Sequence, residues 1–203
     1  MTSLYDPLLR WAMRESTFKH RLVEQARIER AHRILDLGCG TATLTLHIKR
    51  AHPDAEVLGL DGDAKVLQIA RAKAAEADLV LVLNQGTAFQ LPYPDDFFDR
   101  VLSSLLLHHL THENKRRTLR EVFRVLRRGG EFHVADWGRP QGGLARTAFL
   151  LVQMLDGFET TADNVKGLLP ELLRSAGFED VQEPARYGTV FGTLCLLRAR
   201  KPI

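Results

Sequence analysis

The chain has 203 residues, of which 45% are hydrophobic and 26% charged, with a formal net charge of +3. This length suits one α/β domain, and the composition excludes a disordered or fibrous protein. The two cysteines, Cys39 and Cys195, lack the spacing of zinc ligands, so neither a disulfide scaffold nor a structural metal is expected. The first residues do not have the pattern of a secretion signal, and no apolar run is long enough to cross a bilayer. We therefore expect a cytoplasmic protein without a membrane anchor.

Apolar runs typical of buried strands recur along the chain, separated by stretches of helix formers. Residues 4–30 come first and carry Phe18, Leu22 and Ala26 at fourfold spacing, which predicts one or two helices capping the carboxyl-end edge of a sheet. Strands are then predicted over 33–37, 56–60, 79–83, 100–104 and 131–135, with helices over 42–51, 64–77 and 112–127. This alternation predicts a parallel sheet with helices on both faces.

The last third of the chain follows a different pattern. Gly129 and Gly130 are predicted to end the helix over 112–127 and to lead directly into the fifth strand. Beyond a loop, helices are expected over 144–158 and 168–176, and two final strands over 179–184 and 190–199. Because no long helix separates these two strands, they must run antiparallel if they are neighbours.

The strongest functional signal is the segment 34–43, where an apolar strand leads into a glycine-rich turn and then a helix. Gly38 and Gly40 allow the backbone to approach a ligand closely, and the free amides at the start of the next helix favour an anionic group. Asp61 ends the second strand, where a carboxylate can accept hydrogen bonds from ribose hydroxyls. Together these features predict a site for a nucleotide-like ligand.

The segment 34–43 resembles motif I of the class I S-adenosylmethionine (SAM)-dependent methyltransferases, and the resemblance extends over most of the chain. It continues at the second strand end, at the loop after the third strand, at the fourth strand end and at the helix entering the fifth strand, in residues 58–61, 85–99, 103–110 and 121–130. The group resembled includes the ubiquinone and menaquinone methyltransferases. The resemblance implies a Rossmann-like, doubly wound α/β sheet, mostly parallel, with an antiparallel carboxy-terminal strand pair.

The resemblance also implies SAM as cofactor. We expect a single domain over 1–203, made of a helical cap (1–30), a SAM-binding core (31–137) and an acceptor side (138–203). Gly38 and Gly40 would line the methionine end, Asp61 would hold the ribose, and Thr87 with Ala88 would lie beside the adenine. The complete set of expected SAM-binding residues is Asp36, Gly38, Cys39, Gly40, Asp61, Gly62, Thr87, Ala88, Ser104 and Leu105.

Three positions depart from the family pattern. Ala42 stands where a third glycine is common, Thr87 where an aspartate often meets the adenine amino group, and Arg128 where a proline usually precedes the double glycine. Of these, Thr87 bears most directly on cofactor affinity.

Methyl transfer needs alignment of the acceptor more than a nucleophile on the protein. Where the acceptor must lose a proton, His108 or His109, just beyond the fourth strand, is the candidate catalytic base, although either can instead pack or contact SAM. A metal site is not expected, since His108 and His112 could share a helix face but no carboxylate or cysteine completes the set.

The expected partner is a small-molecule acceptor, an apolar compound being one candidate, and neither its identity nor the oligomeric state is legible from the sequence. The apolar stretch 147–155 is interpreted as a core helix, with a lid over the acceptor as the alternative. Several basic residues predict a solvated helix face, and nucleic-acid binding is not expected because no aromatic stripe accompanies them: Lys115, Arg116, Arg117, Arg120, Arg124, Arg127 and Arg128.

Two other classes of protein share parts of this pattern. An NAD-type oxidoreductase also uses a glycine-rich turn and a later acidic residue, but Thr43 stands where its third glycine belongs. A non-catalytic SAM-binding module would keep the turn, and the Thr87 departure is the only hint of it.

Overall fold

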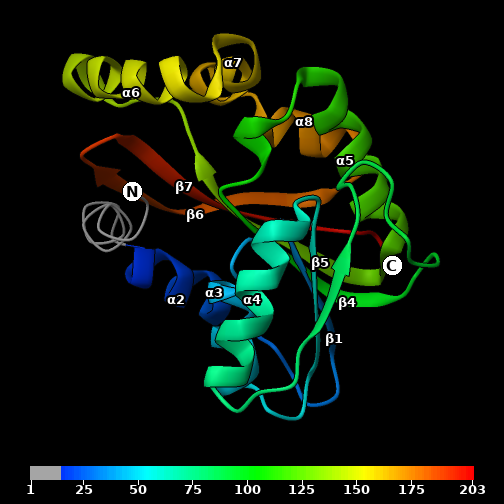
Figure 1. The fold of residues 1–203 in the computed structure, drawn as a ribbon. Coiled ribbons are helices and arrows are strands. Elements are labelled where there is room, and N and C mark those ends of the chain that lie inside the picture. The colour runs from blue at the N-terminus through cyan, green and yellow to red at the C-terminus, as the bar shows by residue number, and fades with distance from the viewer. Residues whose placement is uncertain (1–14) are drawn as a thin grey trace.

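A computed structural model, which describes residues 15–203, contains one mixed sheet in the order β3-β2-β1-β4-β5-β7-β6 (Figure 1). The first five strands pair in parallel, and β7 runs antiparallel to both β5 and β6. The strands are β1 (Arg33–Leu37), β2 (Glu56–Asp61), β3 (Val82–Gln85), β4 (Phe98–Ser104), β5 (Leu126–Trp137), β6 (Glu179–Thr189) and β7 (Gly192–Arg200). The predicted fold class, including the antiparallel end, is confirmed.

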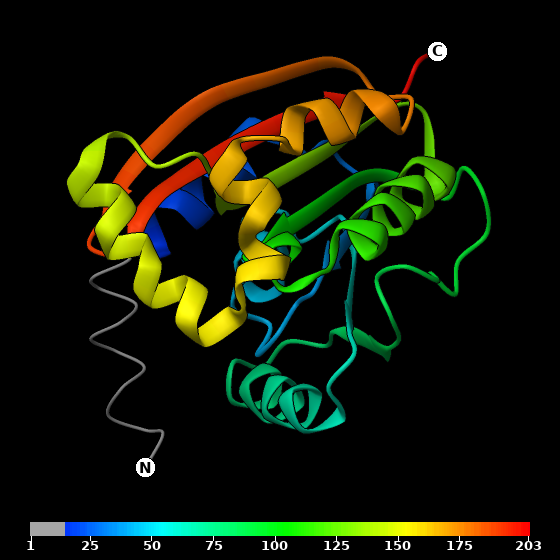
Figure 2. The ribbon, with the colours of Figure 1, turned by 90° about the horizontal axis from the view of Figure 1, so that it is seen from above.

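Helices cover both faces of this sheet because neighbouring residues of each buried strand point to opposite sides. Ile34 and Leu102 belong to an apolar layer under α2 and α3, whereas Leu35 and Val101 belong to a second layer under α5 and α8. Figure 2 shows these two helix pairs on opposite sides of the sheet. The helices are α2 (Glu15–Gln25), α3 (Thr43–Ala51), α4 (Ala64–Glu76), the 3₁₀ helix η1 (Leu107–His109), α5 (His112–Val125), α6 (Gly142–Asp156), α7 (Phe158–Lys166) and α8 (Leu169–Ser175).

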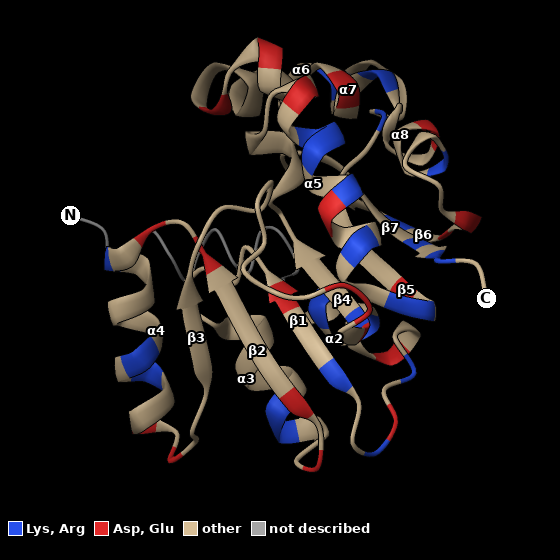
Figure 3. Ribbon diagram, turned by 90° about the vertical axis from the view of Figure 1, so that its right-hand side faces the viewer, with Lys and Arg blue, Asp and Glu red and all other residues tan. Residues whose placement is uncertain are grey.

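Helices α6 and α7 lie above the carboxyl ends of the parallel strands (Figures 1 and 3). Phe149 of α6 is fully buried and meets the Trp137 ring at the end of β5, with the ring centroids 5.5 Å apart. In contrast, Met154 and Leu155 are 73% and 79% exposed. The segment 147–155 is therefore only partly a core helix, and much of its apolar surface faces outward.

The double glycine does not end the helix as predicted. Helix α5 stops at Val125, and β5 begins at Leu126, so Gly129 and Gly130 lie inside a strand. Gly129 has φ 74°, and the pairing of β4 with β5 shifts register beside it. Its amide donates to the carbonyl of Lys201 at 3.0 Å. Backbone pairing with the chain terminus, which no local pattern reveals, makes this segment a bulged strand.

The start of the third strand and the helix after Gly157 also differ from the prediction. The third strand begins at Val82 rather than residue 79, because Asp78 adopts φ 52° and the Leu79 amide still closes helix α4 by donating to the Ala74 carbonyl at 3.0 Å. Helix α7 was not predicted, since its residues include several poor helix formers. It follows Gly157, whose φ of 99° ends α6.

The amino-terminal cap is placed differently from the expectation where the structure describes it. Phe18, Leu22 and Ala26, within and just beyond α2, are buried in the layer shared with α3. Helix α2 thus packs on a face of the sheet, near β5, rather than over the carboxyl-end edge. Residues 1–14 of the predicted cap lie outside the described residues.

Candidate active site

The turn after β1 is attached to the neighbouring strand through backbone hydrogen bonds. The Gly38 and Cys39 amides donate to the Leu60 carbonyl at 2.8 and 3.0 Å. Gly38 has φ 72°, and a Cβ there would lie 2.9 Å from Leu106 Cδ1, so the position requires glycine. A Cβ on Gly40 would meet no atom within 4 Å among the described residues. The turn therefore has a closed side at Gly38 and an open side at Gly40.

Asp61 lies at the open side of this turn. Its Oδ2 accepts the Gly40 amide at 2.9 Å, and its Oδ1 accepts the Asp63 amide at 3.0 Å. Because each carboxylate oxygen can accept two hydrogen bonds, Asp61 keeps acceptor capacity for the hydroxyls of a ligand. The predicted meeting of the glycine turn with the acidic end of the next strand is thus present.

Two of the predicted binding residues lie beneath the turn instead. Asp36 is 1% exposed, and its Oδ2 accepts the Thr45 hydroxyl at 2.6 Å. Burial raises the pKa of Asp36 to about 6, against the opposing effect of the Thr45 hydrogen bond. Cys39 is also buried, and burial raises the pKa of its thiol. Both side chains support the turn from inside.

The loop after β3 lies next to Asp61. The Gly86 amide donates to the Asp61 carbonyl at 3.0 Å, and a Cβ on Gly62 would lie 3.7 Å from the Gly86 carbonyl oxygen. Thr87 is exposed, and Ala88 is half-buried against the core. The structure therefore brings the predicted ribose and adenine positions together.

The end of β4 carries two unusual features. Leu105 has φ 57°, a conformation that costs a residue with a large side chain about 1 to 2 kcal/mol and that clusters at functional sites. The neighbouring Ser104 Oγ is buried without a hydrogen-bond partner in the described structure. An unpaired buried hydroxyl and the open space at Gly40 both fit a polar ligand lying against this edge of the sheet.

Asp136, at the end of β5, organises the histidine region. Its Oδ1 lies 2.8 Å from His108 Nδ1, and its Oδ2 accepts the Leu107 amide at 2.7 Å. The Trp137 amide and the Asn164 side-chain amide also donate to Oδ1, at 2.7 and 3.1 Å. Burial opposes ionisation, but these donors and the charge of His108 outweigh it and lower the pKa of Asp136. Asp136 is therefore a buried anchor that holds His108 in place.

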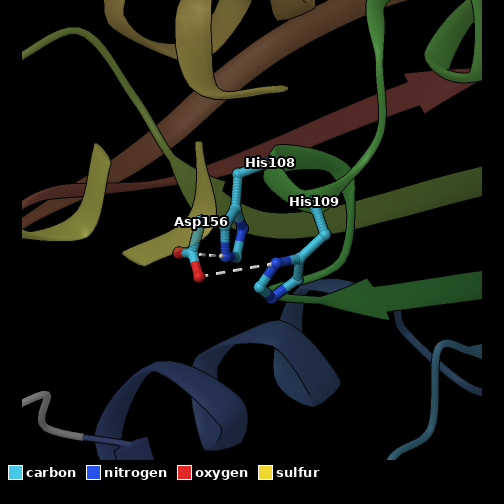
Figure 4. Close-up of side chains that lie close together, drawn as sticks. All are labelled: His108, His109 and Asp156. Atoms are coloured by element: carbon cyan, nitrogen blue, oxygen red, sulfur yellow. Dashed lines mark ion pairs between the residues drawn. The ribbon is translucent and has the colours of Figure 1, made fainter. Parts of the chain in front are cut away.

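His108 and His109 both face Asp156, which ends α6 (Figure 4). His108 Nε2 lies 3.5 Å from Asp156 Oδ2, and His109 Nδ1 lies 3.7 Å from Asp156 Oδ1. His108 is buried, whereas the side chain of His109 is 52% exposed. Burial and the neighbouring His108 lower the pKa of His109. Sequence analysis missed Asp156 because it lies on another helix, far along the chain.

His112 does not share a helix face with His108. His108 belongs to η1, and His112 begins α5, where its Nδ1 lies 3.0 Å from Asp163 Oδ1. The buried Lys115 Nζ lies 3.3 Å from the other oxygen of Asp163 and donates to the carbonyl oxygens of Leu110 and Thr160. These contacts join α5 to α7.

The predicted basic helix face is wrong in part. Lys115 is fully buried, and Arg127 and Arg128 lie in β5 rather than in the helix. Arg124 bonds Glu121 and Asp95 at 2.8 and 2.7 Å, so its charge is neutralised within the fold. Figure 3 shows basic and acidic segments side by side on α5.

Comparisons with known proteins agree with this geometry. The family described as "Methyltransferase domain" matches residues 34–130. An uncharacterized methyltransferase of Synechocystis sp. is 32% identical over 92% of this chain and 84% of its own length. The chain belongs to the methyltransferases, and it is a SAM-dependent enzyme of that family.

Other similar proteins align with this chain over only part of their own length. The ubiquinone/menaquinone biosynthesis C-methyltransferase of Pectobacterium atrosepticum is 35% identical over 61% of this chain, which spans about half (49%) of that relative. The crystal structure of the SAM-dependent methyltransferase SibL in its apo form superposes with a TM-score of 0.75 at 25% identity, covering 100% of this chain and 60% of SibL. In the part of the chain that the structure describes, no helix is long and apolar enough to span a membrane.

Proposed function

We propose that SAM binds across the carboxyl ends of β1, β2 and β4. Gly38 and Gly40 would line its methionine end, and Asp61 would accept hydrogen bonds from the ribose. The adenine would lie against Gly62, Thr87 and Ala88, with Ser104 and Leu105 beneath the ligand and Asp36 and Cys39 supporting the turn. The observation that carries this proposal is the pair of hydrogen bonds that hold Asp61 at the open side of Gly40.

SAM supplies a methyl group on a positively charged sulfur, and the protein's part is to align an acceptor and exclude water. The unpaired hydroxyl of Ser104 would donate a hydrogen bond to the bound ligand. His108 is held by Asp136 on the acceptor side, next to His109. An acceptor hydroxyl that must lose its proton would pass it to one of these imidazoles.

We further propose that the acceptor is small and apolar and binds against the exposed apolar side chains of α6 and α7, within the segment 138–203. Support comes from α6 and the start of α7, where Leu151, Met154, Leu155 and Phe158 are exposed above the carboxyl ends of the strands. The relative from Pectobacterium atrosepticum, by its name, acts in quinone biosynthesis. Of the basic residues of α5, Lys115 and Arg124 are paired with carboxylates within the fold, which reduces the positive charge that a nucleic-acid acceptor would need. A cytoplasmic location remains part of this proposal.

The cofactor site is tested by titrating SAM into Asp61→Asn by calorimetry. We expect SAM affinity to fall roughly tenfold to a hundredfold, because charge-assisted hydrogen bonds contribute about 1.5 to 3 kcal/mol each. Asp54→Asn is the matched control, since Asp54 is an exposed carboxylate just before the amino end of the same strand. Thermal melting checks that both variants fold. Equal SAM affinity in the two variants would remove Asp61 from the site.

The acceptor proposal is tested by thermal shift in the presence of S-adenosylhomocysteine, the demethylated product. Small apolar phenols and quinols should raise the melting temperature, and sugars and nucleotides should not. The double change Met154→Glu and Leu155→Glu should reduce that shift. Val80→Glu, at a residue just before β3 that is 91% exposed, should not. A shift produced only by polar compounds would reject an apolar acceptor.

A further inference from the structure

Three potential metal ligands meet beside the acceptor side of the site. His108 and His109 come from η1, and Asp156 comes from the end of α6. One ligand atom from each residue lies within 4.8 Å of the others, and Figure 4 shows the two imidazoles turned toward the carboxylate. No metal site is predicted from the sequence, in which His108 pairs only with His112 and Asp156 lies far along the chain.

The separations within this trio suit a small divalent cation. Tetrahedral ligands bound at roughly 2.0 to 2.1 Å lie about 3.4 Å apart. The Asp156 oxygens lie 3.5 and 3.7 Å from His108 Nε2 and His109 Nδ1. Only small side-chain movements are therefore needed for all three residues to bind one ion.

A hydrogen bond between His108 Nδ1 and Asp136 fixes the orientation of the imidazole, as carboxylates do for many metal-binding histidines. Asp136 already accepts hydrogen bonds from the Leu107 and Trp137 amides, and as a carboxylate it can only accept. The proton between it and His108 therefore belongs to Nδ1. With His108 neutral, as metal binding requires, the lone pair of Nε2 would be directed toward Asp156.

The trio leaves one side open. The side chains of His109 and Asp156 are 52% and 23% exposed, whereas that of His108 is 4% exposed. We propose that His108, His109 and Asp156 bind a divalent transition-metal ion such as Zn²⁺, with at least one coordination position left for water or substrate. The ion would join η1 to the end of α6.

This inference deepens the proposed function at one point. An acceptor hydroxyl in the open position would release its proton to solvent water more readily than the free acceptor does, because a bound cation lowers the pKa of its oxygen ligand. In the metal-bound form the histidines are ligands rather than bases. Metal binding itself does not depend on the identity of the acceptor.

The test is calorimetric titration of chelator-treated protein with zinc chloride, paired with Co²⁺ absorption spectra. We expect one equivalent of Zn²⁺ and the visible bands of tetrahedral Co²⁺. His109→Gln and Asp156→Asn should each weaken Zn²⁺ binding at least tenfold, consistent with the loss of a ligand. His112→Gln, which changes a neighbouring histidine outside the trio, should leave Zn²⁺ affinity unchanged.

Two results would overturn the metal site: no Zn²⁺ binding by the wild-type protein, or binding that survives both substitutions in the trio. SAM titration of the same samples separates this inference from the proposed function. SAM binding without Zn²⁺ binding rejects the metal site alone, and Zn²⁺ binding without SAM binding rejects the cofactor site alone.

Discussion

Asp36, which lies beneath the glycine-rich turn, makes the stability of the folded protein depend on pH. Its pKa of about 6 in the folded protein lies above the ordinary value of 3.8, so folding favours the protonated carboxyl. The stability that this preference contributes is fully present below 3.8 and is lost as pH rises through 6. At roughly 1.4 kcal/mol per pKa unit, the difference corresponds to about 3 kcal/mol.

The prediction is that Asp36→Asn removes this pH dependence. Between about pH 4 and pH 7, the free energy of unfolding of the wild-type protein should fall by about 3 kcal/mol relative to the variant. Urea titrations of both proteins across this range measure the difference. Parallel pH profiles would show that Asp36 has its ordinary pKa in the folded protein.

Lys115 is the buried cation that joins α5 to α7. Its charge is compensated by Asp163 and by two carbonyl oxygens, and burial lowers its pKa despite these contacts. Lys115→Met should destabilise the fold by about 3 kcal/mol or more, because it leaves buried acceptors without a partner. Arg116→Met, at the exposed neighbouring position, should change stability by less than about 0.5 kcal/mol. Similar chemical denaturation midpoints for the two variants would contradict this role.

The entry to β5 depends on a backbone bulge rather than on a helix stop. A Cβ on Gly130 would lie 2.8 Å from the Arg127 carbonyl oxygen and 3.2 Å from that of Asp99. Backbone atoms cannot move aside as a flexible side chain can. Gly130→Ala should therefore cost about 1 to 3 kcal/mol.

The control for this substitution is Gly143→Ala in the first turn of α6, where a Cβ would meet nothing within 4 Å. Its stability should stay level or rise by up to about 1 kcal/mol, since alanine favours a helix over glycine. Urea denaturation compares the two variants. Equal stabilities would mean that β5 begins without the bulge.

Local sequence patterns predicted the helices, strands and turns that depend mainly on interactions between residues close in the sequence. The alternation of strands and helices, the turn at Gly38 and the acidic end of β2 all follow from short-range signals. Helix α7 could not be predicted in this way, because buried Thr161, Asp163 and Asn164 hold it in place rather than helix propensity. The same reasoning explains β5, whose first residues pair with the end of the chain.

The candidate site also has one part that local sequence patterns predict and one part that only the packing of distant segments creates. Asp61 and the glycines are close in sequence to the strands that carry them, so their meeting follows from a parallel sheet. The group formed by Asp136, His108 and Asp156 combines β5, η1 and α6, and only the packing of α6 over the sheet brings it together. The sequence indicated the histidines but not the Asp156 carboxylate that faces them.

The assembled fold places the glycine-rich turn and the apolar helices α6 and α7 at the carboxyl-end edge of a single sheet. Membership in the methyltransferases excludes the NAD-type oxidoreductase considered from the sequence. The most direct measurement is mass spectrometry after incubation with SAM that carries an isotopically labelled methyl group and a panel of small apolar acceptors. We predict labelled acceptor together with an equal amount of S-adenosylhomocysteine. SAM binding without transfer of label to any acceptor would contradict the enzyme and favour a non-catalytic SAM-binding protein.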